Sequence, residues 1–492
     1  MAITSFATGM TGAALVAGLN NNQGLNITKV EGFSPAASAY TNVAALQAAL
    51  DIGGFILILD PGIYEVNESL YIGSDTHLFC APGVIFKKVA DYGSVIRNNG
   101  SVTRVYDENV TIEGLEIIVN GKTVTVTDGM NGNLAFAYIR NLTMRNIRIA
   151  DGDATLFGIH IICFDTVKLY NLYLHGSKDA LHFHCGHDAF VDGLVMAVTD
   201  DGIGINGLEW NRLNAGISDT YNIHIKNVKE TYVPGAVGYS ITSRVSTWED
   251  WTSGHSYTYR QAALNSVGDL YQSDTGATTV STVEPVHKSG YHTGADGISW
   301  HYLDSDINFY STDVYNITFE DCVFARSPMQ AGTLIHAAGT EALGTYRNIK
   351  FINCVCQTDF NVIWLDSYGN LKDVTLRNCT MSKGLIYYGS DQFQDNDHCD
   401  VTLEGCHITG DSNIIYTLKP GELVTLKGSN NFYTGNPSYI ANAAGSGALL
   451  RITDFDLPIL ETVINNPVVG DIVRTSDGRK IYKAGGWVNM AL

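Results

Sequence analysis

Apolar and polar residues alternate along most of this chain in a nine-residue repeat that occurs at least nine times. Examples read NVTIEGLEI from Asn109, NLTMRNIRI from Asn141 and DVTLRNCTM from Asp373. Alternation with a period of two is typical of β-strands. Several repeats begin about 22–27 residues apart, and self-similarity at such a period indicates a solenoid whose units stack on one another.

Two columns of positions within the repeat predict how each unit folds. The seventh position is always apolar, so we expect it to point into a core. Its members are Leu115, Ile147, Leu172, Leu194, Val228, Cys322, Cys354, Cys379 and Cys406. The sixth position holds only Gly, Asn or Asp, which tolerate left-handed backbone, so the chain is expected to bend there. Its members are Gly114, Asn146, Asn171, Gly193, Asn227, Asp321, Asn353, Asn378 and Gly405.

A further short strand precedes many of the repeats, as in GIHII at Gly158, ALHFH at Ala180, GIGIN at Gly202 and GISWH at Gly297. With the bend at the sixth position, each coil then has three strands. Three strands per coil predict an all-β chain, folded as a right-handed parallel β-helix. A propeller would need antiparallel hairpins, and a leucine-rich repeat would need a helix in each unit.

The ends of the solenoid and one interruption complete the predicted organisation. Thr41 and Asn42 can cap a short helix over 43–50, which would cover the open hydrophobic N-terminal end. The tail reads as a small β module with a turn at 476–478. The predicted parts are a leader or attachment segment at 1–27, a β-helix domain at 28–447 with an aromatic-rich insertion at 243–295, and a C-terminal module at 448–492 that serves oligomerisation.

Charge and cysteine usage exclude several classes of protein. Asp and Glu number 50 against 30 Lys and Arg, a formal net charge of −20, which argues against nucleic acid as a partner. No apolar run reaches transmembrane length, so no membrane insertion is expected, and no Lys or Arg precedes Lys29, so no secretory signal is detected. The nine cysteines lack disulfide or zinc spacing, and we expect buried free thiols and neither metal nor cofactor.

Three aspartates are the candidate catalytic residues, and they lie just before the further short strand in two of the coils. When these strands are superposed by their alternation, Asp179 and Asp201 fall in register, with Asp200 directly before Asp201. Neighbouring coils lie about 4.8 Å apart, so one of these crowded carboxyls can hold a proton while another stays ionised. Glycoside hydrolysis needs such a pair, an acid for the leaving oxygen and a base for water. A single Asp at such a turn would be an ordinary backbone cap.

Polar and aromatic side chains near these aspartates are candidates for binding substrate. The superposition extends the aspartate column to Asp296 and places Ser240 beside Gly204 and Thr242 beside Asn206. Tryptophans of the insertion either offer flat faces to sugar rings or pack the insertion onto the solenoid. The candidate binding residues are His160, His182, His184, Asn206, Arg244, Trp248, Trp251, Asp296 and His301, whereas His336 is expected to be structural.

The segments SKDALHF at Ser177 and VTDDGIGIN at Val198 resemble the polygalacturonase-like family 28 glycoside hydrolases. The resemblance covers roughly residues 135–330 and implies that Asp200 is the general acid, that Asp179 and Asp201 activate the attacking water, and that the reaction inverts the anomeric centre. Val237 stands where the family has a histidine, and Ser299-Trp300-His301 replaces its Arg-Ile-Lys strand. These differences argue against polygalacturonate as the substrate.

The polar leader, the helix-capped β-helix and the small C-terminal module together resemble bacteriophage tailspikes and depolymerases of the pectate-lyase-like β-helix superfamily. That resemblance implies a homotrimer, located on a virion tail or extracellularly, that acts on a bacterial surface polysaccharide. We therefore predict an endo-acting glycoside hydrolase. Two alternatives stay open: a polysaccharide lyase with Lys178 or His182 as its base and a cation on the acids, and a non-catalytic carbohydrate-binding tail fibre.

Overall fold

The computed structural model describes residues 27–29, 32–124, 129–207, 216–257, 259, 261–275, 279–326, 329–335, 345–357, 363–366, 370–381, 386–388, 398–409, 415–416, 423–434, 440–441, 449–453, 472–475, 478–483 and 486–489. The chain divides into two compact units. Unit 1 comprises residues up to 183 together with 187–200 and 233–237, and unit 2 comprises 184–186, 201–232 and the chain from 238 onward. His336 and the predicted leader residues up to 26 lie outside the described residues.

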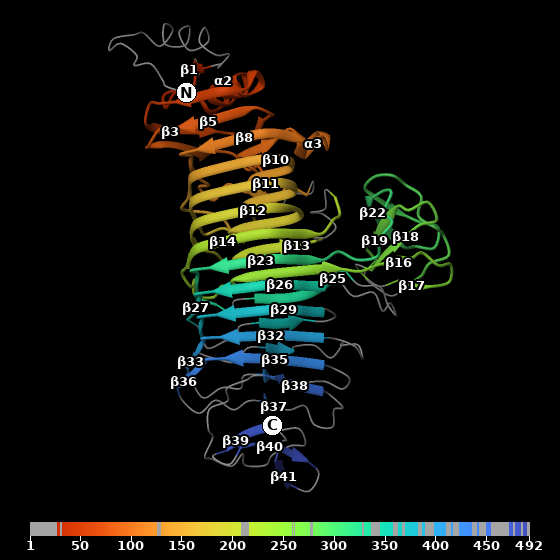
Figure 1. Cartoon of the computed structure of the whole chain (residues 1–492). Coiled ribbons are helices and arrows are strands. Elements are labelled where there is room, and N and C mark those ends of the chain that lie inside the picture. The colour runs from red at the N-terminus through yellow and green to blue at the C-terminus, as the bar shows by residue number, and fades with distance from the viewer. Residues whose placement is uncertain are drawn as a thin grey trace. The chain divides into compact units, whose positions relative to one another are not determined.

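Unit 1 is a stack of parallel strands that pair from one coil to the next. β2 pairs with β5, β3 with β6 and β4 with β7, which makes three strand columns per coil. Further on, the strands of one coil join without a break, and Figure 1 shows β10 and β11 as successive parallel rungs. The strands are β1 Ile27–Lys29, β2 Gly54–Ile58, β3 Gly62–Val66, β4 Leu70–Ile72, β5 Thr76–Cys80, β6 Val84–Lys88, β7 Ile96–Asn98, β8 Asp107–Glu113, β9 Glu116–Ile118, β10 Gly132–Ile149, β11 Phe157–His175 and most of β12 Leu181–Ala197.

Unit 2 continues the same three-column pattern. Figure 1 shows β23, β26, β29, β32 and β35 one after another, and each pairs in parallel with the next. The strands are β13 Ile203–Asn206, β14 Thr220–Glu230, β15 Ile241–Ser246, β23 Val314–Glu320, β24 Val323–Phe324, β25 Met329–Ile335, β26 Thr345–Ile352, β27 Val355–Cys356, β28 Ile363–Asp366, β29 Asn370–Arg377, β30 Thr380–Met381, β31 Ile386–Tyr388, β32 His398–Glu404, β33 His407–Thr409, β34 Ile415–Tyr416, β35 Leu423–Ser429, β36 Phe432–Thr434, β37 Ile440–Ala441 and β38 Leu449–Thr453. The predicted fold class, an all-β right-handed parallel β-helix, is confirmed.

The two predicted columns of the repeat have the expected structure. All nine residues at the seventh position are buried, with at most 2% of their surface exposed. All nine residues at the sixth position have left-handed backbone, with φ between 53° and 84°. The cysteines of the inward column donate their thiol hydrogens to carbonyls of the preceding coil, as Cys379 Sγ does to Phe351 O at 3.4 Å. The eight cysteines that the structure describes as free are all buried, as predicted.

The first position of the repeat is also left-handed, which the sequence did not reveal. Its φ lies between 53° and 62° at Asn109, Asn141, Thr166, Asp188, Asn222, Asn316, Asn348 and Asp373. Where this position is Asn, the side-chain amides form a ladder along the coils: Asn141 Nδ2 donates to Asn109 Oδ1 at 2.8 Å, and Asn348 Nδ2 to Asn316 Oδ1 at 2.8 Å. Thr166 and Asp188 interrupt this ladder in unit 1.

A helix covers the N-terminal end of unit 1. The helix, α2 Ala39–Ile52, is longer than predicted, and its N-cap is Ser38, whose Oγ accepts the N–H of Thr41 at 3.2 Å. The predicted cap, Asn42, instead accepts the N–H of Ser34 at 3.0 Å and donates to Glu65 O at 3.2 Å. Gln47 pairs its amide with both backbone groups of Tyr71, at 2.8 and 2.9 Å. A second helix, α3 Gly100–Thr103, is a single turn.

The insertion begins and ends later than predicted. β15 runs to Ser246 and pairs in parallel with β13, so it belongs to the solenoid, whereas β22 pairs antiparallel with β19 and β21. The segment GISWH alternates like a solenoid strand, which is why the sequence placed it there. The strands of the insertion are β16 Glu249–Asp250, β17 Ser256–Tyr257, β18 Ala262–Leu264, β19 Leu270–Ser273, β20 Thr279–Val280, β21 Tyr291–Thr293 and β22 Ser299–Asp304.

The tail contains a small antiparallel sheet of β39 Ile472–Thr475, β40 Gly478–Lys483 and β41 Gly486–Asn489. Thr475 pairs with Gly478 across the predicted turn, whose residues 476 and 477 lie outside the described part of the chain. Within the part of the chain that the structure describes, we find no helix with the length and apolar character that crossing a membrane requires.

Candidate functional site

Asp179 and Asp200 lie on successive coils of unit 1. Backbone hydrogen bonds hold the two coils in register here, because Thr199 N donates to Ser177 O at 3.1 Å and Asp200 N donates to Lys178 O at 2.8 Å. On its other side, Asp179 O accepts the N–H of Gly158 at 2.8 Å. A carboxylate oxygen of Asp179 and one of Asp200 lie within 4.8 Å of each other. The structure therefore brings together two of the three predicted catalytic residues in this unit.

The two carboxylates differ in their surroundings. Asp179 is 2% exposed, and its Oδ2 lies 2.9 Å from His182 Nδ1. The side chain of Asp200 is 30% exposed, and its Oδ2 lies 3.5 Å from Lys178 Nζ. A molecule arriving from solvent can therefore reach Asp200, whereas Asp179 is fixed in place by a buried imidazole.

His160 and His182 form a buried stack beside Asp179. The ring of His182 stacks on Phe157 with 4.3 Å between centroids and 5° between planes, and His160 packs edge-on against it at 5.2 Å. His160 Nδ1 accepts the N–H of Asn131 at 3.2 Å. Because His160 is 0% and His182 only 4% exposed, these rings position Asp179 and do not present a surface to a sugar.

Asp201 follows Asp200 in the chain and makes its contacts in unit 2. Its Oδ1 accepts the N–H of Tyr239 at 3.0 Å, and its Oδ2 lies 4.0 Å from Arg244 Nη2. Within the same unit, β13 and β15 pair Gly204 with Thr242 and Asn206 with Arg244. Arg244 therefore lies on the strand beside Asn206 and reaches the aspartate.

The predicted register of this strand pair was wrong by two residues. The sequence had placed Ser240 beside Gly204 and Thr242 beside Asn206, but Ser240 precedes the pairing. A shift of two residues keeps every side chain on its own face, so hydrophobic alternation cannot detect it. His184 and Asn206, two of the candidate binding residues in unit 2, are both fully buried.

The prediction for Asp296 and His301 was wrong about their place, because both belong to the insertion. Asp296 Oδ2 accepts the backbone N–H groups of Thr282 at 2.8 Å and Val283 at 3.0 Å. Desolvation raises the pKa of Asp296, but these and other backbone hydrogen bonds outweigh it and lower the pKa overall. His301 stacks on Tyr291, with 4.3 Å between ring centroids. Asp296 is thus a cap that joins two loops of the insertion.

The tryptophans of the insertion differ from each other. Trp248 is 0% exposed, packs in a core with Leu264 and Leu303, and donates Nε1–H to Phe309 O at 2.7 Å. Trp248 therefore packs the insertion, which is the structural one of its two predicted roles. Trp251 is half-buried and donates Nε1–H to Ser281 Oγ at 2.8 Å.

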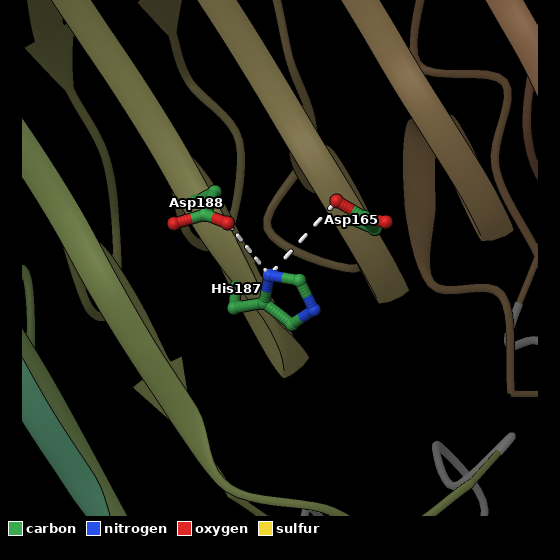
Figure 2. A group of neighbouring side chains, drawn as sticks. All are labelled: Asp165, His187 and Asp188. Carbon is green, nitrogen blue, oxygen red and sulfur yellow. Dashed lines mark hydrogen bonds and ion pairs between the residues drawn. The ribbon is translucent and has the colours of Figure 1, made fainter.

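A second cluster of titratable side chains in unit 1 was missed by the sequence interpretation. Figure 2 shows Asp165 on one strand and His187 and Asp188 on the next, with the imidazole between the carboxylates. His187 Nδ1 lies 2.9 Å from Asp188 Oδ2 and 3.9 Å from Asp165 Oδ1. Superposing the first positions of the repeats, where Thr166 and Asp188 align, would have found it. Among the described residues, this cluster and the Asp179–Asp200 pair are places where side chains could hold a divalent cation.

No protein-family model and no curated protein matches the sequence. Solved structures with a similar course of the chain include the mannuronan C-5 epimerase AlgE4 A-module of Azotobacter vinelandii, at 11% identity, covering 86% of this chain and 97% of that one, with a TM-score of 0.46. Others are the family 28 exopolygalacturonase of Yersinia enterocolitica (13% identity, 90% and 79% covered, TM-score 0.49) and tailspike protein 3 of bacteriophage CBA120 (10% identity, 99% and 71% covered, TM-score 0.39). At such identities the likeness concerns the fold alone.

Proposed function

We propose that this chain is an endo-acting polysaccharide hydrolase whose reacting groups are Asp179, Asp200 and the next residue in the chain, Asp201. The observation that carries the proposal is the Asp179–Asp200 pair, with carboxylate oxygens within 4.8 Å on successive coils. Two carboxyls at this distance do not both ionise readily, because their like charges repel. The pair therefore provides one proton donor and one proton acceptor, the combination that glycoside hydrolysis uses.

The different surroundings of the aspartates support a different role for each. Asp200 is the accessible carboxyl and protonates the leaving glycosidic oxygen. Lys178 Nζ, 3.5 Å from Asp200 Oδ2, stabilises the carboxylate that forms as the proton leaves. Asp179, oriented by His182, accepts a proton from the attacking water, and Asp201, held by Tyr239 N–H, assists it.

The surroundings of Lys178 favour hydrolysis over elimination. A lyase would need a free neutral base, whereas Lys178 Nζ lies 3.5 Å from Asp200 Oδ2. His182, the other candidate base, is buried and already bonded to Asp179. The following test distinguishes the hydrolase from the other alternative, a carbohydrate-binding fibre without catalysis.

We expect the purified chain to shorten one member of a panel of capsular polysaccharides and lipopolysaccharides, measured by size-exclusion chromatography. A hydrolase leaves no ultraviolet-absorbing product end and keeps its activity in a chelator. An absorbing, unsaturated end would instead show a lyase, and polysaccharide that is bound but never shortened would show a fibre. Proton NMR of the first product checks the predicted inversion of the anomeric centre. The test is informative because the two carboxyls of inverting enzymes are usually about 6.5–9.5 Å apart, whereas carboxylate oxygens of Asp179 and Asp200 lie within 4.8 Å.

We also propose that the chain assembles as a homotrimer on a virion tail or another extracellular structure, with 1–27 as attachment segment, 28–447 as catalytic domain and 448–492 as the trimerisation module. Three short antiparallel strands, β39 to β41, make a core too small to be stable alone, and association about a common axis would enlarge it. Light scattering should give three times the chain mass, and deletion of residues 464–492 should lower it. A monomer at micromolar concentration would contradict the assembly without affecting the catalytic proposal.

A further inference from the structure

The cluster of Asp165, His187 and Asp188 in unit 1 has no part in the function proposed above. Figure 2 shows the imidazole between the two carboxylates, which come from neighbouring strands. The side chains of Asp165, His187 and Asp188 are 39%, 33% and 49% exposed. A dissolved ion can therefore reach the cluster without any change in the fold.

The distances within this cluster fit the ligand shell of a metal ion. A tetrahedral zinc ion with bonds of about 2.0–2.2 Å holds its ligand atoms about 3.3–3.6 Å apart. His187 Nδ1 lies 2.9 Å from Asp188 Oδ2 and 3.9 Å from Asp165 Oδ1, on either side of that spacing. Each residue offers one ligand atom within 4.8 Å of the other two. Small rotations of these exposed side chains are enough to bring the three atoms around one ion.

Neighbouring groups hold the carboxylate of Asp165 in place. Thr166 Oγ1 donates to Asp165 Oδ1 at 2.9 Å, and Arg140 Nε lies 3.9 Å from the other oxygen, Oδ2. The same guanidinium lies 3.1 Å from Glu108 Oε1, so it is shared between two carboxylates. Carboxylates that bind metals are commonly oriented by such outer hydrogen bonds and ion pairs. Arg140 thus steadies the far oxygen of Asp165, while Oδ1 faces His187.

The cluster also lies where the side-chain ladder of unit 1 is interrupted. Asn141 Nδ2 donates to Asn109 Oδ1 at 2.8 Å and so links two coils. The next two coils have Thr166 and Asp188 at this position, with the same left-handed backbone but without an amide. A cation held by the cluster would join these two coils in place of the missing amides. This argument is independent of the distances within the cluster.

We propose that Asp165, His187 and Asp188 bind a zinc ion that joins two coils of unit 1. Zinc is favoured over calcium and magnesium because one donor is an imidazole nitrogen, whereas those two ions take oxygen donors in larger shells. Three protein ligands leave a fourth position for water. The expectation that the chain binds no metal rested on the spacing of its cysteines, and no cysteine belongs to this cluster. The inference does not depend on catalysis, because the ion takes part in no step of the proposed reaction.

Isothermal titration calorimetry of the untagged full chain with zinc chloride tests the proposal, after a chelator has removed any metal and has itself been dialysed away. We expect one equivalent of zinc to bind, and calcium chloride under the same conditions to give no binding. Equal binding of calcium would overturn the assignment to zinc. Absence of zinc binding would show that the three groups are only a hydrogen-bonded imidazole between two carboxylates.

Two variants locate the ion. His187→Ala and Asp165→Asn should each weaken zinc binding more than about 10-fold, because loss of an outer partner of a ligand alone commonly costs about 10–100-fold. Both side chains are partly exposed, so the variants should fold, and circular dichroism checks that they do. Parental affinity for zinc in both variants would refute the site.

His224→Ala is the matched control. His224 Nε2 also lies 2.9 Å from a carboxylate, that of Glu320, and its side chain is 40% exposed. Among the described residues, however, this pair belongs to no cluster of three metal-binding groups, so zinc binding should stay at the parental level. Zinc binding that is lost in Asp200→Asn but kept in His187→Ala would place the ion at the proposed catalytic aspartates and overturn the inference.

Discussion

Asp200→Asn should lower the rate of polysaccharide cleavage about 10²–10⁴-fold, because an amide cannot deliver a proton to the leaving oxygen. Asp179→Asn and Asp201→Asn should cause losses of similar size, since each removes a carboxylate that accepts a proton or supports the acceptor. Asn has nearly the same shape as Asp and can keep the contacts with His182 and Tyr239. The melting temperature of the three variants should therefore stay close to that of the parent chain.

The rates are measured as the number of new reducing ends released from the polysaccharide that the parent chain cleaves. Asp165→Asn is the matched control, because Asp165 lies in the separate cluster of Figure 2 and is 39% exposed. It should cleave at the parental rate. The catalytic assignment fails if the three variants fold and also cleave at that rate.

Arg326→Met should lower the free energy of unfolding by about 3–5 kcal/mol, the largest stability effect we expect in unit 2. Arg326 Nε lies 2.7 Å from Glu230 Oε1, and the two side chains are only 5% and 1% exposed. Glu230 Oε2 also accepts the N–H of Ala325 at 2.8 Å and the hydroxyl of Ser240. Without the guanidinium, a buried carboxylate loses its compensating charge while it remains cut off from water.

Urea denaturation followed by circular dichroism measures this effect. The matched control is Arg377→Met, because Arg377 lies 2.8 Å from Glu404 but both side chains are well exposed, at 53% and 39%. An exposed pair should contribute less than about 1 kcal/mol. Combining Arg326→Met with Glu230→Gln should recover part of the loss, since no charge is then buried. Equal losses for Arg326→Met and Arg377→Met would show that the buried pair is not special.

The repeat predicted the solenoid well because its two informative columns are local properties of the chain. Whether a residue such as Asn146 tolerates left-handed backbone, or Cys379 suits a core, is decided by the residue itself and its place in the repeat. Thr166 shows the limit of that reasoning. Its φ of 62° follows from its alignment with Asn141 and Asp188 and not from its own preference, because β-branched residues disfavour this conformation.

The candidate site was predicted less completely, for reasons of register. Asp179 and Asp200 were found because the strands that follow them belong to successive repeats, about one coil length apart. Asp296 was misplaced because the strand after it alternates like a solenoid strand, although it pairs antiparallel with β19 and β21. Alternation reports which face a side chain occupies, not which strand lies beside it.

The amide side chains of α2 have a consequence for end-to-end contacts between copies of the protein. The first coil of a parallel stack has strand edges whose N–H and C=O groups could pair with another chain. The side-chain amides of Asn42 and Gln47 form hydrogen bonds with backbone groups of Ser34, Glu65 and Tyr71. They thus take the place of a further strand, but they offer no new strand edge to another chain. We expect a chain in which both are replaced by Ala to expose this edge and to associate end to end into filaments, which light scattering would detect.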